Sequence, residues 1–478
     1  MKLKKLFKNC DVEVPANLEA LEINKIHYDS RKVGKGDLFV AVKGFQTDGH
    51  KFLKQVENQG AAVAVVNQKD ESLKLNQVVV EDSRAIMALL AYNYYEEYLE
   101  KLDLIGITGT NGKTTCSYLI RSILEAEGIS CGLAGTIHYV IGAKKIDAWN
   151  TTPEAIDLYE MLAQMQQAGN KACVLEVSSH ALALGRVDGL KFKAALFTNL
   201  SRDHMDFHKD MDTYFADKSK LFSQLEEEGF AITNNDDPYG AKITARNKIS
   251  FGTKNNADAY SNKWQVNNTG MQLDVQIPTG LLKIESAMVG EFNVYNLLGA
   301  VATGLALNLS PDSIKKGLAN QKSVPGRLET HQLKNKALAI IDYAHTPDAM
   351  EKALSTVRQI TENKLTVVFG CGGDRDRGKR PQMGEVAQKW ADHTIVTDDN
   401  PRTENPQQII NDILAGMKKD SSMEIINDRR NAITKAVKNS TKGDVVLIAG
   451  KGHENYQVIG KVKHDFDEAA IIQEADYA

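Results

Sequence analysis

Residues 109–115 read Gly-Thr-Asn-Gly-Lys-Thr-Thr and lie between an apolar run at 104–108 and a helix-like stretch at 114–127. A buried strand, a glycine turn and a helix N-terminus together form a cradle for phosphate. Backbone N–H groups and the helix dipole face the anion, Lys113 neutralises it, and a hydroxyl such as that of Thr114 holds Mg²⁺. The stretch therefore predicts a nucleoside triphosphate site.

One position departs from the usual phosphate-loop pattern, G-x-x-x-x-G-K-[ST]. That pattern places a glycine five residues before Gly112, where this chain has Ile107. A glycine-rich turn without a ligand therefore stays open as an alternative at this point. A phosphate loop also names no reaction, because kinases, motors, switches and ligases all use one.

The composition is that of an ordinary globular protein. The chain has 478 residues, of which 42% are hydrophobic and 25% charged, and its net charge is −4. The length predicts about two to four domains, and the charge argues against nucleic acid as the main partner. Five scattered cysteines without a C-x-x-C pair disfavour disulfides and zinc sites and suit a reducing cytosol.

The N-terminal segment does not have the pattern of a signal peptide. Residues 1–8 are basic, but Asn9, Cys10 and Asp11 follow where an apolar region would be needed. No apolar run approaches the roughly 18 residues of a membrane span. We therefore expect a cytoplasmic protein that is not inserted in a membrane.

The alternation of strand-like and helical segments predicts an α/β protein of three domains. Residues 1–100 contain strand-like runs at 37–42 and 61–66 and a helical stretch at 83–98. Residues 101–327 alternate strands such as 172–177 and 194–198 with helices, as a nucleotide-binding domain does. Residues 328–478 restart the pattern as a Rossmann-like domain, with strands at 338–341, 365–369, 393–397 and 445–449 and helices that begin near 347, 381, 406 and 429.

Four polar segments of the third domain each follow the carboxyl end of a predicted strand. They are Asp342-Tyr-Ala-His345, Gly370-Cys-Gly-Gly-Asp-Arg375, Asp398-Asp-Asn-Pro-Arg402 and Gly450-Lys-Gly-His-Glu454. Open α/β sheets bind their ligands at this edge. The shared placement favours a substrate site over four unrelated turns.

Three segments of the central part are rich in possible metal and phosphate ligands. They span residues 176–180, 199–206 and 214–222. A carboxylate at a strand end is the expected second anchor for Mg²⁺ beside a phosphate loop, so we interpret Glu176 as a metal ligand. The alternatives are a surface salt bridge for Glu176, an ordinary histidine for His204 and a helix-surface lysine for Lys218.

On six motifs in family order, the chain resembles the Mur ligases, the ATP-dependent enzymes that extend the peptidoglycan stem peptide. The motifs are G-T-N-G-K-T-T at 109–115, E-V-S-S-H at 176–180, T-N-L-S-R-D-H-M-D at 198–206, G-E-F-N-V-Y-N at 290–296, V-P-G-R-L-E at 324–329 and D-Y-A-H-T-P-D at 342–348. The resemblance covers essentially the whole chain, and Ile107 belongs to the family's version of the phosphate loop. It implies a uridine-nucleotide-binding domain at 1–100, a central ATP-binding domain at 101–327 and a Rossmann-like amino-acid-binding domain at 328–478.

The resemblance also implies roles for the matching positions. The implied ATP contacts are Gly109, Thr110, Asn111, Gly112, Lys113, Thr114, Thr115, Asn293, Asn296, Arg327 and Asp342. The implied magnesium ligands are Thr114, Glu176, His204 and Lys218, with Lys218 carbamylated to N6-carboxylysine. A bare ammonium would repel Mg²⁺, whereas a carbamate supplies the oxygen that this cation prefers. Glu176, His204 and Lys218 are thus expected to be catalytic together with Lys113.

The segment Asp399-Asn-Pro-Arg402 is similar to that of family members that add diaminopimelate, and lysine-adding relatives usually lack the arginine. A guanidinium can bind the second carboxylate of diaminopimelate bidentately, and lysine has no such group. The implied contacts are Arg375, Asp399, Asn400, Pro401, Arg402, Gly450 and Glu454, where Glu454 could pair with the distal ammonium. A close isostere with the same carboxylate, such as lanthionine, stays open.

The segments 29–31 and 44–50 are similar to the uridine-nucleotide-binding part of these family members. Contacts to the UDP-muramoyl-dipeptide are implied for Ser30, Gln46, Thr151, Thr152, Ser178 and Arg186. Two positions depart from the enterobacterial pattern, because Phe45 replaces a histidine and Leu184 replaces a glutamine. The contacts at those two positions are left open.

The implied reaction is a ligation of three small-molecule substrates by a protein that we expect to be a monomer. The D-glutamyl carboxylate of UDP-N-acetylmuramoyl-L-alanyl-D-glutamate attacks the γ-phosphate of ATP, and the amine of meso-diaminopimelate then attacks the acyl phosphate. His180 and His345 are both candidates for the base that deprotonates the amine. Two rival functions are folylpolyglutamate synthesis, which uses the same fold and loop, and a regulatory ATPase that binds the precursor without ligating it.

Overall fold

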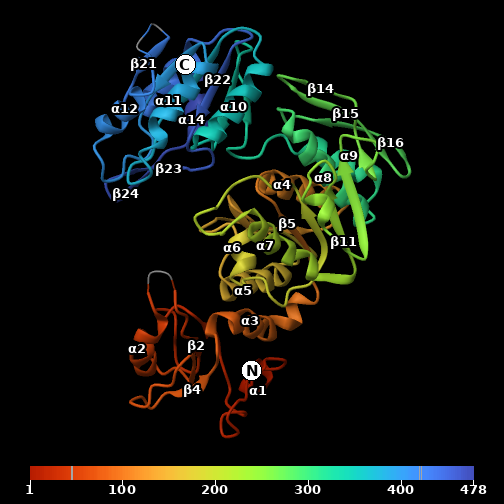
Figure 1. Ribbon diagram of the computed structural model, residues 1–478, viewed down its shortest axis with the longest axis vertical. Coiled ribbons are helices and arrows are strands. Elements are labelled where there is room, and N and C mark those ends of the chain that lie inside the picture. The colour runs from red at the N-terminus through yellow and green to blue at the C-terminus, as the bar shows by residue number, and fades with distance from the viewer. Residues whose placement is uncertain (45–46, 419, 421, 478) are drawn as a thin grey trace. The chain divides into compact units, whose positions relative to one another are not determined.

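The protein is described by a computed structural model that covers residues 1–44, 47–418, 420 and 422–477. Its chain divides into two compact units. The first unit contains residues 1–260 and 298–317, and the second contains 261–297 and 318–478. Figure 1 shows the elements of both units in chain order. The three-domain boundaries near residues 100 and 327 stay a prediction.

The N-terminal part of the first unit is a parallel sheet of four strands in the order β1-β2-β3-β4. Alternate residues of β2 and β3 enter two apolar clusters, one with α2 and the other with α3, because successive side chains of a strand point to opposite faces. Asp82 caps α3 by accepting hydrogen bonds from the N–H groups of Arg84 and Ala85. The elements are α1 (Leu3–Leu6), β1 (Ile26–His27), β2 (Leu38–Val40), η1 (Gly49–Phe52), α2 (Leu53–Asn58), β3 (Val63–Val66), β4 (Asn76–Val79) and α3 (Ser83–Leu99).

The larger sheet of the first unit has the strand order β13-β12-β11-β10-β5-β9-β6-β7-β8. Its strands are parallel except for the antiparallel edge β6-β7-β8. Strand β5 lies between β10 and β9, and α4 follows it (Figure 1). The elements are β5 (Asp103–Thr108), α4 (Lys113–Ala126), β6 (Cys131–Ala134), β7 (His138–Ile141), β8 (Lys144–Asp147), α5 (Ala155–Gln167), β9 (Ala172–Glu176), α6 (Ser179–Ala183), β10 (Phe192–Phe197), α7 (Met211–Ser223), β11 (Leu225–Asn234), η2 (Gly240–Lys242), β12 (Asn247–Gly252) and β13 (Ala259–Tyr260).

The second unit begins with three antiparallel strands, β14 (Trp264–Asn267), β15 (Gly270–Ile277) and β16 (Gly280–Ser286). The helices α8 (Phe292–Ala306) and α9 (Pro311–Asn320) follow in the chain. The sequence patterns did not predict this antiparallel segment, because its strands pair with their neighbours and lack the helical crossovers that mark a parallel sheet.

The C-terminal part of the second unit is a six-stranded sheet in the order β17-β18-β22-β19-β20-β21. All neighbours are parallel except β17 and β18. Residues 338, 340, 365, 367 and 369 pack in one apolar cluster with α10 and α11, while residues 339, 341 and 368 pack in another with α13 and α14. Helices therefore cover both faces, as in a doubly wound fold. The elements are β17 (Glu329–Gln332), β18 (Leu338–Asp342), α10 (Pro347–Gln359), β19 (Leu365–Phe369), α11 (Lys379–Trp390), β20 (His393–Val396), α12 (Pro406–Leu414), β21 (Met423–Ile425), α13 (Arg429–Lys438), β22 (Val445–Ala449), β23 (Tyr456–Ile459), β24 (Val462–Asp465) and α14 (Glu468–Tyr477).

The four predicted strands of the C-terminal part are confirmed as β18, β19, β20 and β22. These strands run parallel, so the polar segments that follow them lie along one edge of the sheet. No helix among the described residues is both long and apolar enough to cross a membrane.

Candidate active site

The phosphate loop lies between β5 and α4, as predicted. Gly109 has a φ of +145° and Gly112, the N-cap of α4, has a φ of +86°, a region that favours glycine. Ile107 is fully buried within β5, where it pairs with Leu196 and Glu176 of the neighbouring strands. The position of the missing glycine is therefore a core strand position, and the turn begins at Gly109 instead.

The segment after β10 forms hydrogen bonds that hold the phosphate loop in place. Thr198 donates a hydrogen bond through Oγ1 to the Asn111 carbonyl at 2.6 Å, and the Asn111 N–H donates to Asn199 Oδ1 at 3.0 Å. The Ser201 N–H donates to Thr110 Oγ1 at 3.0 Å. The start of the ligand-rich segment thus fixes the backbone of the phosphate loop, a role that the sequence did not indicate.

The close packing at Gly109 gives a testable prediction. A Cβ at this position would lie 2.0 Å from Thr198 Oγ1. We expect Gly109→Ala to lower the free energy of unfolding by about 2–4 kcal/mol, because it adds this clash to a strained φ. Thermal unfolding and nucleotide titration would measure the effect.

Gly128→Ala is the matched control, since Gly128 also has a positive φ, +85°, but a Cβ there meets nothing within 4 Å. Gly128→Ala should lower the free energy of unfolding by about 1–2 kcal/mol, which is the cost of the positive φ alone. Equal losses for the two variants would contradict the steric role of Gly109.

Two lysines lie against the phosphate loop. Lys113 Nζ donates to the carbonyls of Gly109 at 2.8 Å and Thr110 at 2.9 Å, and Lys218 Nζ donates to the Gly109 carbonyl at 2.9 Å. Lys218 is 1% exposed and lies over the ring of Tyr214. Burial, reinforced by the charge of Lys113, holds the pKa of Lys218 well below its ordinary value. The alternative of a helix-surface lysine is therefore wrong.

Glu176 is a fully buried carboxylate at the end of β9. Its Oε2 accepts hydrogen bonds from the hydroxyls of Thr114 and Thr136, both at 2.9 Å, and its Oε1 accepts from the Thr136 N–H at 3.0 Å. The alternative of a surface salt bridge is wrong, because no cation reaches this carboxylate among the described ion pairs. Thr136 is a supporting residue that no sequence motif indicated.

The donor set beside the loop fits a magnesium ion. Mg²⁺ takes hard oxygen ligands, commonly one or two carboxylates together with substrate phosphates. The hydroxyl of Thr114 and the carboxylate of Glu176 are adjacent at the start of α4. Among the described residues no three His, Cys, Asp or Glu side chains form a metal cage by themselves.

His204 lies in a cluster of histidine rings. Its φ is +54°, and its ring centroid is 5.0 Å from that of His180. His208 is 2% exposed and bonds Ser179 Oγ at 2.9 Å and Asp217 Oδ2 at 3.1 Å. Burial and the two neighbouring imidazoles lower the pKa of His180. His208 links the segment after β9 to α7, and sequence reasoning missed it.

The predicted contacts to the muramoyl-dipeptide mostly converge. Thr152 Oγ1 accepts from the Ser178 N–H at 3.1 Å, and Arg186 Nη1 donates to the Thr152 carbonyl at 3.0 Å. Thr151 Oγ1 lies 3.1 Å from Thr136 Oγ1, next to Glu176. Ser30 is buried after β1, and no described hydrogen bond joins it to this group. Leu184 follows α6, whereas Phe45 and Gln46 lie outside the described residues.

The remaining predicted ATP contacts lie in the second unit. Asn296 Nδ2 donates to Asn293 Oδ1 at 2.6 Å, so the two amides share a face of α8 as expected. Asp342 accepts hydrogen bonds from the N–H groups of Leu328 and Ala344, both at 2.9 Å. Burial raises the pKa of Asp342. The guanidinium of Arg327 lies over the ring of Tyr343.

The other predicted base, His345, follows β18. Its Nδ1 lies 2.8 Å from the Tyr343 carbonyl, which makes Nδ1 the donor and Nε2 the acceptor of a neutral ring. Partial desolvation of the ring and the nearby charge of Lys379 lower the pKa of His345, although its side chain is exposed. The geometry does not choose between His345 and His180 as the base.

The polar segments after β20 and β22 form one network. Asn400 Nδ2 donates to Glu454 Oε2 at 2.8 Å, and Lys451 Nζ donates to Asn400 Oδ1 at 2.9 Å. Lys451 is fully buried, which lowers its pKa. A Cβ at Gly450 would lie 2.7 Å from Asp399 Oδ2. Lys451 lies at the centre of this network, although the sequence analysis did not select it from the segment 450–454.

The arginines of the predicted amino-acid site lie next to this network. Arg402 Nη1 donates to the Gly373 carbonyl at 2.8 Å, and Arg375 is exposed. A Cβ at Gly372 would lie 2.8 Å from Arg402 Nη1 and 3.8 Å from Arg375 Cγ. Both arginines therefore flank Gly372.

Three family models match the chain. They are described as the Mur ligase family catalytic domain at residues 22–95, the Mur ligase middle domain at 107–304 and the Mur ligase glutamate ligase domain at 326–452. The chain is also 44% identical to the UDP-N-acetylmuramoyl-L-alanyl-D-glutamate–2,6-diaminopimelate ligase of Clostridium perfringens, over 99% of each chain. The chain belongs to the Mur ligase family. The predicted α/β fold with N-terminal, middle and C-terminal Mur ligase parts is thereby confirmed.

Solved structures agree with this assignment. One of a UDP-N-acetylmuramoyl-L-alanyl-D-glutamate–2,6-diaminopimelate ligase is 32% identical with a TM-score of 0.75, and covers 100% of this chain and 99% of its own. A folylpolyglutamate synthase of Mycobacterium tuberculosis is 17% identical with a TM-score of 0.60, over 77% of this Mur ligase and 91% of the synthase. The second likeness shows the shared fold alone.

Proposed function

We infer that this Mur ligase forms an amide bond between the D-glutamyl carboxylate of UDP-N-acetylmuramoyl-L-alanyl-D-glutamate and an amino group of 2,6-diaminopimelate, at the expense of ATP. Full-length identity of 44% to a ligase of that name carries the inference. The product is a precursor of peptidoglycan. The meso stereoisomer and the individual residue roles below are part of the proposal.

The first chemical step is phosphoryl transfer. The glutamyl carboxylate attacks the γ-phosphate of ATP, which gives an acyl phosphate and ADP. The N–H groups at the start of α4 bind the phosphates, and Lys113 leaves its loop carbonyls to offset the charge that develops on the transferred group. Mg²⁺ held by Thr114, Glu176, His204 and a carbamylated Lys218 would stabilise the same charge as a Lewis acid.

Carbamylation of Lys218 is chemically suited to its site. A neutral amine attacks CO₂, and the depressed pKa of Lys218 keeps the amine neutral. Its position against the Gly109 carbonyl brings the resulting carbamate beside the phosphate loop. The modification would turn a buried neutral amine into an anionic oxygen ligand.

The second step is attack of the diaminopimelate amine on the acyl phosphate, with release of phosphate. Arg402 and Arg375, on either side of Gly372, would bind the distal carboxylate, and Glu454, oriented by the amide of Asn400, would bind the distal ammonium. Lysine lacks that carboxylate and would leave a guanidinium unpaired. Asp399, Pro401 and Gly450 would shape the same pocket.

The substrates and the free thiols both support a cytoplasmic location. ATP and UDP-linked precursors are cytoplasmic metabolites, and all five cysteines are free thiols in the described structure, which suits a reducing compartment. We propose a cytoplasmic monomer that acts on small molecules. Neither a folylpolyglutamate synthase nor a regulatory ATPase has a specific observation in its favour.

The test is phosphate release by purified protein with ATP, Mg²⁺ and UDP-muramoyl-dipeptide. Sustained release is expected with meso-diaminopimelate and not with lysine, and lanthionine serves as the isosteric competitor. Steady phosphate release without any amino acid would favour a regulatory ATPase and contradict the ligase function.

A further inference from the structure

The two loops that carry Arg375 and Arg402 both contain a non-glycine residue with left-handed backbone. Asp374 has a φ of +54° and Arg402 a φ of +50°. Such a conformation is unfavourable for an L-residue with a Cβ, so it persists where surrounding contacts hold it. The contacts around these two residues therefore show what sets the positions of the arginines.

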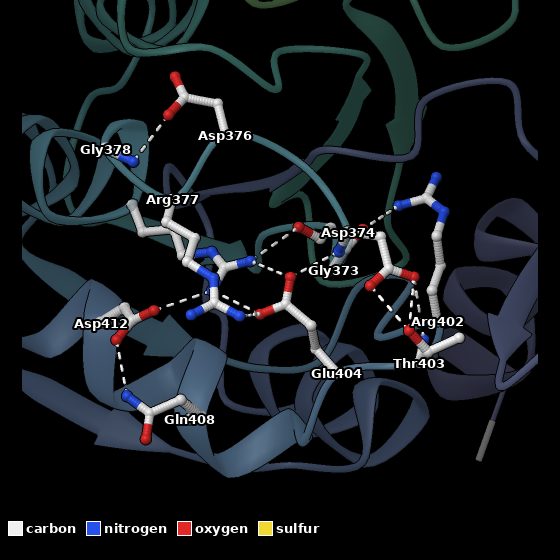
Figure 2. A network of polar contacts seen from close by, with 12 residues as sticks. Gly373, Asp374, Asp376, Arg377, Gly378, Arg402, Thr403, Glu404, Gln408 and Asp412 are labelled. Atoms are coloured by element: carbon white, nitrogen blue, oxygen red, sulfur yellow. Dashed lines mark hydrogen bonds and ion pairs between the residues drawn. The ribbon is translucent and has the colours of Figure 1, made fainter.

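A buried ion pair joins the two loops. Arg380, on α11, is fully buried, and its Nη2 and Nη1 donate to Glu404 Oε1 at 2.9 Å and Oε2 at 3.1 Å. Glu404 Oε1 also accepts the Asp374 N–H at 2.6 Å. Figure 2 shows the carboxylate of Glu404, two residues after Arg402 in the chain, where several dashed lines meet. One carboxylate thus fixes the backbone of the first loop from the second.

A second tie runs in the opposite direction. Thr403 donates through Oγ1 to Asp374 Oδ1 at 2.8 Å, and its N–H donates to Asp374 Oδ2 at 3.2 Å. Arg402 itself is held through its main chain, because its N–H donates to the Val458 carbonyl at 3.0 Å and its carbonyl accepts the Gly460 N–H at 2.8 Å. The backbone of Arg402 is therefore fixed by β23 on one side and by the loop of Asp374 on the other.

The ion pair is anchored away from the loops. Arg380 Nη1 also donates to Asp412 Oδ2 of α12 at 2.8 Å. The bonds from Arg380 hold the pKa of Glu404 down at about 2, so this carboxylate is charged at neutral pH. A buried guanidinium with two carboxylates adds little net stability, because desolvation offsets the attraction, but it fixes a geometry. Apolar side chains could fill the same space without orienting the loops.

We propose that the Arg380–Glu404 ion pair is a positioning device for Arg375 and Arg402, and that it thereby determines selectivity for an amino acid with a second carboxylate. The proposal deepens the proposed function and rests on it. Neither residue touches the amino acid. They set the spacing of the two guanidinium groups, and a distal carboxylate is bound well at one spacing only.

The test uses Glu404→Gln in the full-length protein. The KM for diaminopimelate should rise by about tenfold, and the preference over lysine should fall by a similar factor, since small misplacements of a binding group have effects of this order. The kcat and the KM values for ATP and UDP-muramoyl-dipeptide should stay within about twofold, inside the scatter of neutral substitutions.

Asp392→Asn is the matched control. Asp392 also accepts from an arginine, Arg358 at 2.6 Å, and from a backbone N–H, that of Leu365 at 2.7 Å, but it lies at the amino ends of β19 and β20. It should leave the KM for diaminopimelate unchanged. A rise equal to that of Glu404→Gln would show a general loss of stability and overturn the proposal.

A double-substitution cycle separates positioning from a structural role. In a background that carries both Arg375→Ala and Arg402→Ala, Glu404→Gln should have little further effect on the KM for diaminopimelate, because both groups that it positions are gone. Additive effects would overturn the proposal. Should Glu404→Gln fail to fold, Thr403→Val decides instead. Thr403 is exposed, so this variant should fold and raise that KM about threefold, the cost of a modest hydrogen bond, whereas an unchanged KM would overturn the proposal.

Different results would contradict the proposed ligase function and the positioning role of the ion pair. Phosphate release that ignores diaminopimelate in the unsubstituted protein would contradict the proposed function. A selective unsubstituted ligase, together with folded variants of unchanged KM and selectivity, would contradict the positioning role alone.

Discussion

Replacement of Arg402 by alanine is expected to lower kcat/KM for diaminopimelate by about 10²- to 10³-fold, the range for truncating one partner of a desolvated charge pair. Arg402 lies beside Arg375 at Gly372, where its guanidinium would meet the distal carboxylate. The effect should fall mainly on the KM for diaminopimelate, and the activity with lysine should change little. Steady-state kinetics with the two amino acids would measure both quantities.

Arg430→Ala is the control for this prediction. Arg430 is a half-exposed arginine of α13 that pairs with Glu474. Its removal should leave kcat/KM unchanged with both diaminopimelate and lysine. A parallel loss of activity with diaminopimelate and lysine in Arg402→Ala would contradict a selective contact to the distal carboxylate.

Replacement of Lys218 by methionine is expected to reduce turnover by about 10³-fold or more, because an electrostatic group aimed at the transferred phosphoryl contributes on that scale. Lys218 is buried and bonded to the Gly109 carbonyl. Methionine keeps most of the side-chain volume and cannot be carbamylated. The assay is single-turnover formation of ADP, with circular dichroism to verify the fold.

Lys220→Met on the same helix is the control for Lys218. Lys220 is half exposed and pairs with Asp217, so its loss should be nearly silent. Isotopically labelled bicarbonate should produce a carbamate carbon signal in the unsubstituted protein and in Lys220→Met, and none in Lys218→Met. A Lys218→Met enzyme with normal turnover would remove Lys218 from the mechanism.

The sequence predicted the parallel strands and the loops at their carboxyl ends because both depend on local pattern. Mostly apolar runs of four to six residues became β5, β9, β10, β18, β19 and β22. The antiparallel β14–β16 segment was not predicted, because exposed polar residues alternate with buried ones along its strands and leave no continuous apolar run.

The burial of Lys218 could have been predicted from the sequence. Tyr214, Lys218, Leu221 and Phe222 are the buried residues of α7, and they recur with the spacing of one helix face. The apolar neighbours therefore place the lysine on the inner face. The family resemblance and this periodicity are therefore two independent signals for Lys218.

The supports of the site could not be predicted in this way. Glu404 and Arg380 are 24 residues apart in the chain, and Thr136 and Glu176 are 40 apart. Nothing local distinguishes Glu404, Arg380 and Thr136 from ordinary surface or turn residues. Their roles follow from tertiary contacts between loops, which one sequence does not contain.

In the proposed mechanism, ATP activates the D-glutamyl carboxylate as an acyl phosphate before diaminopimelate attacks. The most direct measurement uses UDP-muramoyl-dipeptide whose glutamyl carboxylate carries a heavy oxygen isotope, with mass spectrometry of both products. We predict that one labelled oxygen appears in the released phosphate and that the new amide retains the other. Unlabelled phosphate, or phosphate release without a new amide bond, would contradict the acyl-phosphate mechanism.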